Sequence, residues 1–357
     1  MFYYLLVARA VYALAWFYLS PLLPLMARDL SVQEAQLGWL PAAFIAGAAA
    51  MQIPASWIGA RIGDVRTAGI GLFLLGLGSA LVGASGSWPE ALAFRALAGA
   101  GAGLFFSTAG AALVSLRPEA AGAALGWYNA AFNVGALAGY YWGYVAALAG
   151  WRAAAVAPGL AIAAIAVPLI AESGFRHEHK LDASAVTLGL VSFPIWGAVY
   201  AANSLAASWL TYYRHVPPSL AGAISSASMA SGLLGGALGA IYDRARNKGL
   251  VFAATSILTA AAMASMPYLP PVAAPAAVFA YGVFYTIYIT AIYAEGSRRG
   301  QPSSALAVIN VIDMALGLNI SYLFSYAMAI YPPLAWAITA VLASASASAV
   351  ALVLRRP

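Results

Sequence analysis

Three ionisable side chains stand inside long apolar segments of this chain, where a charge is costly and is therefore usually functional. Arg9 and Arg95 lie near the ends of two such segments, and Asp313 lies ten residues into the segment 303–330. Ten residues of helix rise about 15 Å, which places Asp313 near the middle of a bilayer. A carboxyl at that depth must be neutral, paired or in a wet cavity, so we expect Asp313 to carry protons.

The two arginines favour an anionic or polar ligand over a lipophilic cation, because guanidinium groups match carboxylates. Arg9 shares one helical face with Tyr12 and Trp16, an arrangement that suits the wall of a cavity. Each charged group also has a structural explanation. Arg9 and Arg95 could extend to the nearer membrane surface, and Asp313 could pair with an arginine or an asparagine.

The composition is that of an integral membrane protein. Hydrophobic residues make up 63% of the 357 residues and charged residues only 8%, against about 25% charged in a soluble domain. The net charge of +6 comes from basic residues in short loops, which indicates membrane topology rather than nucleic-acid binding. The absence of cysteine excludes disulfides and thiolate metal sites, and we expect no cofactor.

Twelve apolar segments each supply the roughly 20 residues that a bilayer requires. A polar stretch near the middle, 172–182, predicts a cytoplasmic linker between a six-helix bundle at 1–171 and another at 183–357. We interpret His177 and His179 in this stretch as solvated residues rather than metal ligands. The predicted spans are 2–27, 36–60, 67–85, 90–114, 121–148, 152–171, 184–213, 219–242, 249–268, 272–294, 303–330 and 333–354.

The distribution of basic residues predicts the orientation. With both termini inside, the inner loops and the C-terminal tail hold twelve basic residues, and the outer loops hold three. The positive-inside rule therefore predicts that both termini are cytoplasmic. We expect a multi-pass protein of the plasma membrane that retains its first helix, because no basic region precedes the apolar run that begins at Phe2.

A basic loop between two apolar segments carries the most specific motif. Gly239 is followed by Asp243, Arg244, Arg246 and Lys248. This spacing resembles the loop signature of the major facilitator superfamily, Gly-x-x-x-Asp-Arg-x-Gly-Arg-Arg, with Arg246 at the position of the second Gly. Small residues such as Gly239 let a neighbouring helix approach closely.

Further features extend the resemblance over essentially the whole chain. Gly59 and Asp64 form a first-half counterpart of this loop, with the acid one residue late, and Arg95-x-x-x-Gly99 is similar to the family's Arg-x-x-Gln-Gly motif. The resemblance implies an all-α integral membrane protein with twelve transmembrane helices in two six-helix pseudo-symmetric bundles. It also implies gating by Gly59, Asp64, Gly239, Asp243, Arg244 and Arg246.

In this family, spans 1, 4, 7 and 10 surround the substrate. By that resemblance, the predicted substrate-binding residues are Arg9, Tyr12, Trp16, Arg95, Trp196, Tyr200, Asn203, Tyr281, Tyr285 and Tyr288. Interfacial belts and ordinary packing explain many aromatic residues of membrane proteins, and they are the alternative for these side chains.

The leading hypothesis is a secondary active transporter of a small organic solute, an organic anion or a polar metabolite, that works by alternating access with proton coupling through Asp313. The alternatives are a transporter that exports hydrophobic drugs and a non-transporting membrane sensor on the same scaffold. An enzyme is disfavoured, because all three histidines lie in loops and cysteine is absent. We expect a monomer whose partners are its substrate and the lipid bilayer, not nucleic acid.

Overall fold

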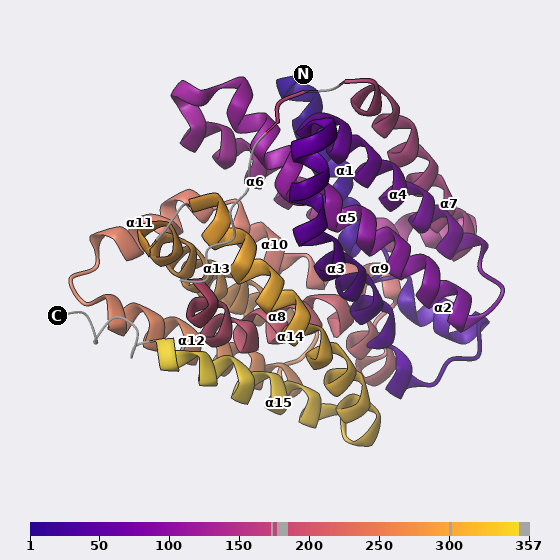
Figure 1. Cartoon of the computed structure of the whole chain (residues 1–357). Coiled ribbons are helices and arrows are strands. Elements are labelled where there is room, and N and C mark those ends of the chain that lie inside the picture. The colour runs from indigo at the N-terminus through magenta and orange to yellow at the C-terminus, as the bar shows by residue number, and fades with distance from the viewer. Residues whose placement is uncertain (173, 177–184, 300–301, 350–357) are drawn as a thin grey trace. The chain divides into compact units, whose positions relative to one another are not determined.

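The structure of the chain, a computed structural model, describes residues 1–172, 174–176, 185–299 and 302–349. Every regular element in this part of the chain is an α-helix or a short 3-10 helix (Figure 1). The apolar sequence explains this, because a helix in lipid satisfies its own backbone hydrogen bonds and needs only an apolar surface. The all-helical membrane fold predicted from the sequence is confirmed.

The helices fall into two compact units. Unit 1 comprises Met1–Val32 and Trp39–Lys180, and unit 2 comprises Gln33–Gly38 and Leu181–Pro357. The α-helices of unit 1 are α1 (Phe2–Phe17), α2 (Leu23–Asp29), α3 (Trp39–Ile62), α4 (Asp64–Ala84), α5 (Trp88–Leu116), α6 (Ala121–Tyr140) and α7 (Trp142–Ala171). Those of unit 2 are α8 (Val186–Arg214), α9 (Pro218–Ser225), α10 (Ala227–Gly232), α11 (Gly235–Arg244), α12 (Lys248–Ser265), α13 (Ala274–Arg299), α14 (Pro302–Ile330) and α15 (Pro332–Ala345).

Nine helices within the described residues are long and apolar enough to cross a bilayer. The other three predicted spans correspond to α6 and to two interrupted helices, α1–α2 and α9–α10–α11. The predicted count of twelve therefore agrees with the structure. The boundary between the fifth and sixth spans is a break inside α7, where Gly150 has a φ of 78°, a conformation that glycine adopts without strain.

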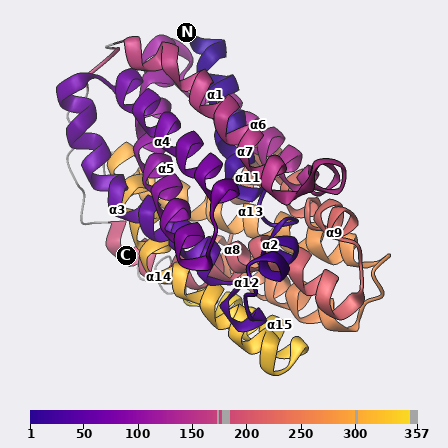
Figure 2. The ribbon, with the colours of Figure 1, turned by 90° about the vertical axis from the view of Figure 1, so that its right-hand side faces the viewer.

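In unit 1, α4 packs between α5 and α7 (Figures 1 and 2). Helix α6 lies directly on α1, and glycine makes this approach possible. A Cβ at Gly135 would lie 1.8 Å from the carbonyl oxygen of Ala10, and one at Gly139 would lie 2.9 Å from that of Leu14. Small residues at such contacts let transmembrane backbones approach closely. The close approach brings the aromatic side chains of α6 next to the cationic residue of α1.

Six residues between α2 and α3, Gln33–Gly38, group with unit 2. Their short 3-10 helix, η1 (Glu34–Gln36), packs on α14, where the Ser325 hydroxyl donates to the carbonyl oxygen of Ala35 at 2.9 Å. The sequence alone places this segment within the first bundle. The predicted linker residues His177 and His179 lie outside the described residues.

We expect Gly135→Ala to lower the melting temperature of the purified protein. The added Cβ must push α6 away from Ala10, and overpacking of this kind costs about 1–3 kcal/mol. Gly126→Ala is the matched control on the same helix, because no atom lies within 4 Å of its Cβ position. That variant should be neutral, or more stable by up to about 1 kcal/mol through helix propensity. Equal melting temperatures for the two variants in one detergent would contradict the packing of α6 on α1.

Candidate functional site

Arg9 is enclosed by aromatic rings in the interior of unit 1. Its side chain is only 2% exposed. The guanidinium carbon lies 4.1 Å from the ring centre of Tyr128, 4.6 Å from Phe132, 4.7 Å from Tyr12 and 4.9 Å from Phe106. These rings come from α1, α5 and α6. Their negative faces stabilise a cation that is buried away from water.

The aromatic cage leaves hydrogen-bond donors of Arg9 unused. Its Nε and Nη1 atoms are buried and have no hydrogen-bond partner among the described residues. Ring faces stabilise the charge but do not accept these in-plane N–H groups as an oxygen would. Leaving a buried donor without a partner is costly. The arrangement therefore suits a ligand with an acceptor oxygen, such as a carboxylate.

Trp16 extends the same aromatic cluster by one helical turn. Its ring is tilted against Tyr12 at 5.8 Å and meets Phe44 edge-on at 4.9 Å. The predicted trio of Arg9, Tyr12 and Trp16 thus lies in one cluster. The sequence did not indicate Phe106, Tyr128 or Phe132, because their part in the cage depends on which faces of α5 and α6 turn toward α1.

Arg95 is equally buried but binds the backbone. Its Nη1 donates to the carbonyl oxygen of Ala15 and its Nη2 to that of Trp16, each at 2.9 Å. Helix α1 ends at Phe17, and the last carbonyls of a helix have no partner within it. The guanidinium also lies 4.0 Å from the ring centre of Phe44. These contacts fix the point where α1 gives way to α2, so Arg95 positions the wall that carries Trp16.

Asp313 is fully buried in unit 2, on α14. The hydroxyl of Ser192 on α8 donates to its Oδ1 at 2.6 Å, while Oδ2 has no hydrogen-bond partner within the described part of the chain. A carboxyl with one oxygen bonded and the other open can take up and release a proton on the open oxygen. The sequence indicated Asp313 but not Ser192.

The carboxyl lies beside the turn of α8 that contains Pro194. Pro194 has no N–H to give to the helix. One residue later, the N–H of Ile195 donates to the hydroxyl of Ser346 at 3.1 Å. The hydroxyl of Tyr288 on α13 lies 3.2 Å from the carbonyl oxygen of Val191 and 3.0 Å from that of Ser346. Polar side chains thus bind the backbone of α8 next to Ser192.

The remaining predicted aromatic and amide residues lie on α8 and α13 of unit 2. Trp196 and Tyr200 stack at 5.3 Å, and the hydroxyl of Tyr281 donates to Asn203 Oδ1 at 3.0 Å. These four side chains are buried, whereas Tyr285 is only partly buried. The structure therefore pairs Asn203 with Tyr281 across two helices, as the sequence pattern alone could not.

In the first-half loop, the position of Asp64 explains why residue 59 is a glycine. Asp64 is the first residue of α4 and is fully buried. A Cβ at position 59 would lie 2.5 Å from Asp64 Oδ1, so only glycine fits there. The N–H of Asp64 donates to the carbonyl oxygen of Phe175 at 2.7 Å. Gly59 and Asp64 therefore form one local unit, despite the extra residue between them relative to the signature.

The second-half loop exposes its charges. Gly239 lies within α11, and Asp243, Arg244 and Arg246 are exposed. The ammonium group of Lys248 donates to the carbonyl oxygens of Tyr242 and Asp243, where α11 ends. A cation at a helix C-terminus is favourable, because it meets the negative end of the helix dipole.

The sequence missed a second buried acid of unit 2, Glu295. Its side chain is 1% exposed and accepts a hydrogen bond of 2.5 Å from the hydroxyl of Tyr242. The predicted span ended at residue 294, so Glu295 was counted in a loop. The structure extends α13 to Arg299 and buries the acid. Asp313 is therefore not the only buried acid of unit 2, although it is the deeper one in its helix.

The family model of the major facilitator superfamily matches residues 5–321. The chain belongs to this superfamily. It is therefore a multi-pass membrane protein of a transporter family, as its motifs indicated. Two solved structures share the fold of this facilitator. The xylose transporter XylE from E. coli, in a partially occluded inward-open conformation, has a TM-score of 0.75 and 13% identity, with 100% of this chain and 97% of XylE covered.

The second structure is a D-xylose-proton symporter. Its TM-score is 0.74 at 14% identity, and 98% of this chain and 96% of the symporter are covered. No curated protein sequence matches this facilitator. At identities this low, the structural similarity establishes a shared fold.

Arg95→Gln should lower the free energy of unfolding by about 1.5–3 kcal/mol, because hydrogen bonds from a charged group to the α1 carbonyls are lost. Arg61→Gln removes the same charge from an exposed side chain and should change stability by less than about 0.5 kcal/mol. Thermal unfolding of both variants gives the comparison. If Arg95→Gln lowers the free energy of unfolding no more than Arg61→Gln does, Arg95 does not position α1.

Proposed function

We propose that this facilitator is a proton-coupled secondary transporter of a small polar organic solute, with an organic anion as the favoured substrate. It works by alternating access in the plasma membrane, as a monomer with both termini in the cytoplasm. The observation that carries this proposal is the carboxyl of Asp313, which is fully buried on α14 with one oxygen bound to Ser192 and the other open.

Proton coupling requires a group that is charged in one state and neutral in another. Asp313 fits, because a buried carboxylate is costly in lipid and its charge becomes acceptable only when water or a partner reaches it. When one conformation opens the site to water, the open Oδ2 releases its proton; when the site closes, the carboxyl takes one up. Ser192 holds Oδ1 in place throughout this cycle.

An anionic substrate is supported by Arg9. Its guanidinium is buried in an aromatic cage, to which Tyr12 contributes one ring, and two of its N–H-bearing atoms have no partner among the described residues. A carboxylate could accept from these donors while the ring faces contact an apolar portion of the solute. Trp16 and the residues Trp196, Tyr200, Asn203, Tyr281, Tyr285 and Tyr288 are the further substrate contacts that we propose.

Two comparisons agree with this proposal at a coarser level. The solved structures that share the fold include one described as a xylose transporter and one as a D-xylose-proton symporter. Their descriptions supply a precedent for polar solutes and for protons on this scaffold. A sugar is therefore the second candidate substrate, and a screen of organic acids and sugars by thermal shift would separate the two classes.

The loop residues complete the proposed cycle. Gly59 and Asp64 in unit 1, and Gly239, Asp243, Arg244 and Arg246 in unit 2, would set the balance between inward- and outward-open states. The close contact of Asp64 with Gly59 and the Lys248 cap on α11 give both loops a defined conformation. Defined loops are needed if a few side chains are to bias an equilibrium between two states.

Asp313→Asn should abolish accumulation of substrate driven by a proton gradient in proteoliposomes, while counterflow exchange continues. Asparagine keeps an acceptor for Ser192 but cannot release a proton. Asn319→Ala, an exposed polar position on the same helix, should retain both activities. Concentrative uptake by Asp313→Asn under a proton gradient would show that the coupling group lies elsewhere.

Arg9→Gln should weaken the binding of an anionic substrate by about 1.5–3 kcal/mol, the scale of a charge-assisted hydrogen bond. Arg9→Lys should restore little of this affinity, because the ammonium group lacks the planar fork of a guanidinium. Calorimetric titration of the solute found by the screen measures both variants. Unchanged affinity in Arg9→Gln would reduce Arg9 to a structural cation and favour an uncharged solute.

A further inference from the structure

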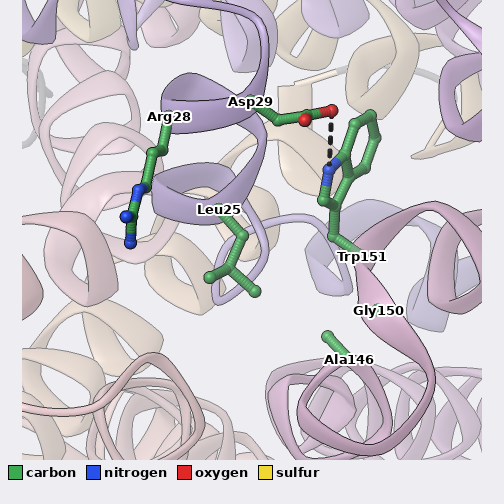
Figure 3. A pocket seen from close by; sticks show the side chains of 6 residues that line it. All are labelled: Leu25, Arg28, Asp29, Ala146, Gly150 and Trp151. Atoms are coloured by element: carbon green, nitrogen blue, oxygen red, sulfur yellow. Dashed lines mark hydrogen bonds between the residues drawn. The ribbon is translucent and has the colours of Figure 1, made fainter.

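A cavity apart from these charged sites lies in unit 1, where α2 ends and α7 is interrupted (Figure 3). It has a volume of ≈ 440 Å³ and is lined by Leu25, Arg28, Asp29, Ala146, Gly150 and Trp151. Its size falls in the range of small-ligand pockets, about 300–1,000 Å³. Neither the proposed proton site nor the proposed substrate site uses any of these residues.

By the predicted topology, the cavity lies where apolar helices meet water. Arg28 and Asp29 close α2, and the break at Gly150 separates two apolar runs of α7. Trp151 is buried, and its indole N–H donates to Asp29 at 3.2 Å. An apolar ring with a bound polar tip is typical of a membrane–water interface. Leu148, two residues before the break, is 92% exposed, an exposure that lipid favours.

The charge of the cavity is positive. The carboxylate of Asp29 is already neutralised, because it accepts from Arg152 at 2.9 Å and from Trp151. Arg28 is exposed and forms no hydrogen bond or ion pair within the described part of the chain. Figure 3 shows Arg28 on one side of Leu25 and the Asp29–Trp151 pair on the other. One free guanidinium therefore stands beside apolar walls.

We propose that this cavity binds the headgroup of an anionic phospholipid. The guanidinium of Arg28 holds the phosphate through charge-assisted hydrogen bonds. The acyl chains leave toward the exposed apolar surface near Leu148. A soluble phosphate ester offers the same anion but has no acyl chains to cover the apolar surface. A membrane lipid therefore fits both the guanidinium of Arg28 and the apolar surface near Leu148. By the predicted orientation, this lipid belongs to the outer leaflet.

The test uses the full chain, which has no native cysteine. A single cysteine introduced by Ala146→Cys lines the cavity. In nanodiscs of phosphatidylglycerol, its alkylation by N-ethylmaleimide should be about tenfold slower than in phosphatidylcholine, the change expected from occupancy stabilised by one charge-assisted contact. Adding Arg28→Gln to the same chain should remove this difference.

Two controls separate the possible sources of protection. Ala149→Cys places the same thiol at an exposed position that does not line the cavity, and it should react at similar rates in both lipids. Glycerol phosphate added to phosphatidylcholine nanodiscs should not protect Ala146→Cys. The proposal is overturned if both lipids give equal rates at Ala146→Cys, if protection survives Arg28→Gln, or if glycerol phosphate protects as well as the lipid.

Discussion

The backbone of this facilitator must find its hydrogen bonds inside the protein, because lipid offers none. At several helix ends, a side chain from another helix supplies them. Arg95 donates to the open end of α1, and Arg66 donates to the carbonyl oxygen of Ile170 at the end of α7 at 3.0 Å. Near Pro194 in α8, the Ser346 hydroxyl accepts from the N–H of Ile195, and the Tyr288 hydroxyl donates to the carbonyl oxygen of Val191. The bonds on α1 and α8 lie next to Trp16 and Ser192 of the candidate sites.

The same constraint distinguishes buried polar groups that bind the backbone from buried polar groups with donors or acceptors that remain unpaired. Arg9 is stabilised by rings that accept no in-plane hydrogen bonds, so its charge is tolerated while its donors stay open. Asp313 has a single hydroxyl partner, so one of its oxygens stays open as well. One unit thus holds a cation with free donors and the other an acid with a free oxygen. Such groups are costly in a folded chain unless a ligand or a proton completes them.

The sequence predicts the helices and the family because both depend on local pattern. Apolar runs, basic loops and the spacing from Gly239 to Asp243 are visible without any knowledge of packing. It also indicates Asp313, since an acid in mid-span stands out by depth alone. Ser192 and the cage residue Phe132 could not be indicated, because serines and aromatics are common in these helices and only the facing surfaces select them. Glu295 was missed because the predicted span ended at residue 294, whereas α13 continues to Arg299.

Arg9 and Arg95 show most clearly what the sequence leaves open. Each is an arginine near the end of an apolar span with a glycine-rich or aromatic neighbourhood, and pattern alone treats them alike. In the structure both are 2% exposed, yet Arg95 gives two donors to backbone carbonyls and Arg9 keeps donors open. The difference arises from the neighbours: the end of α1 presents carbonyl oxygens to Arg95, whereas rings of α1, α5 and α6 surround Arg9. For a buried arginine, depth in the membrane indicates an energetic cost, and the hydrogen bonds of its guanidinium show how far the fold itself uses the group.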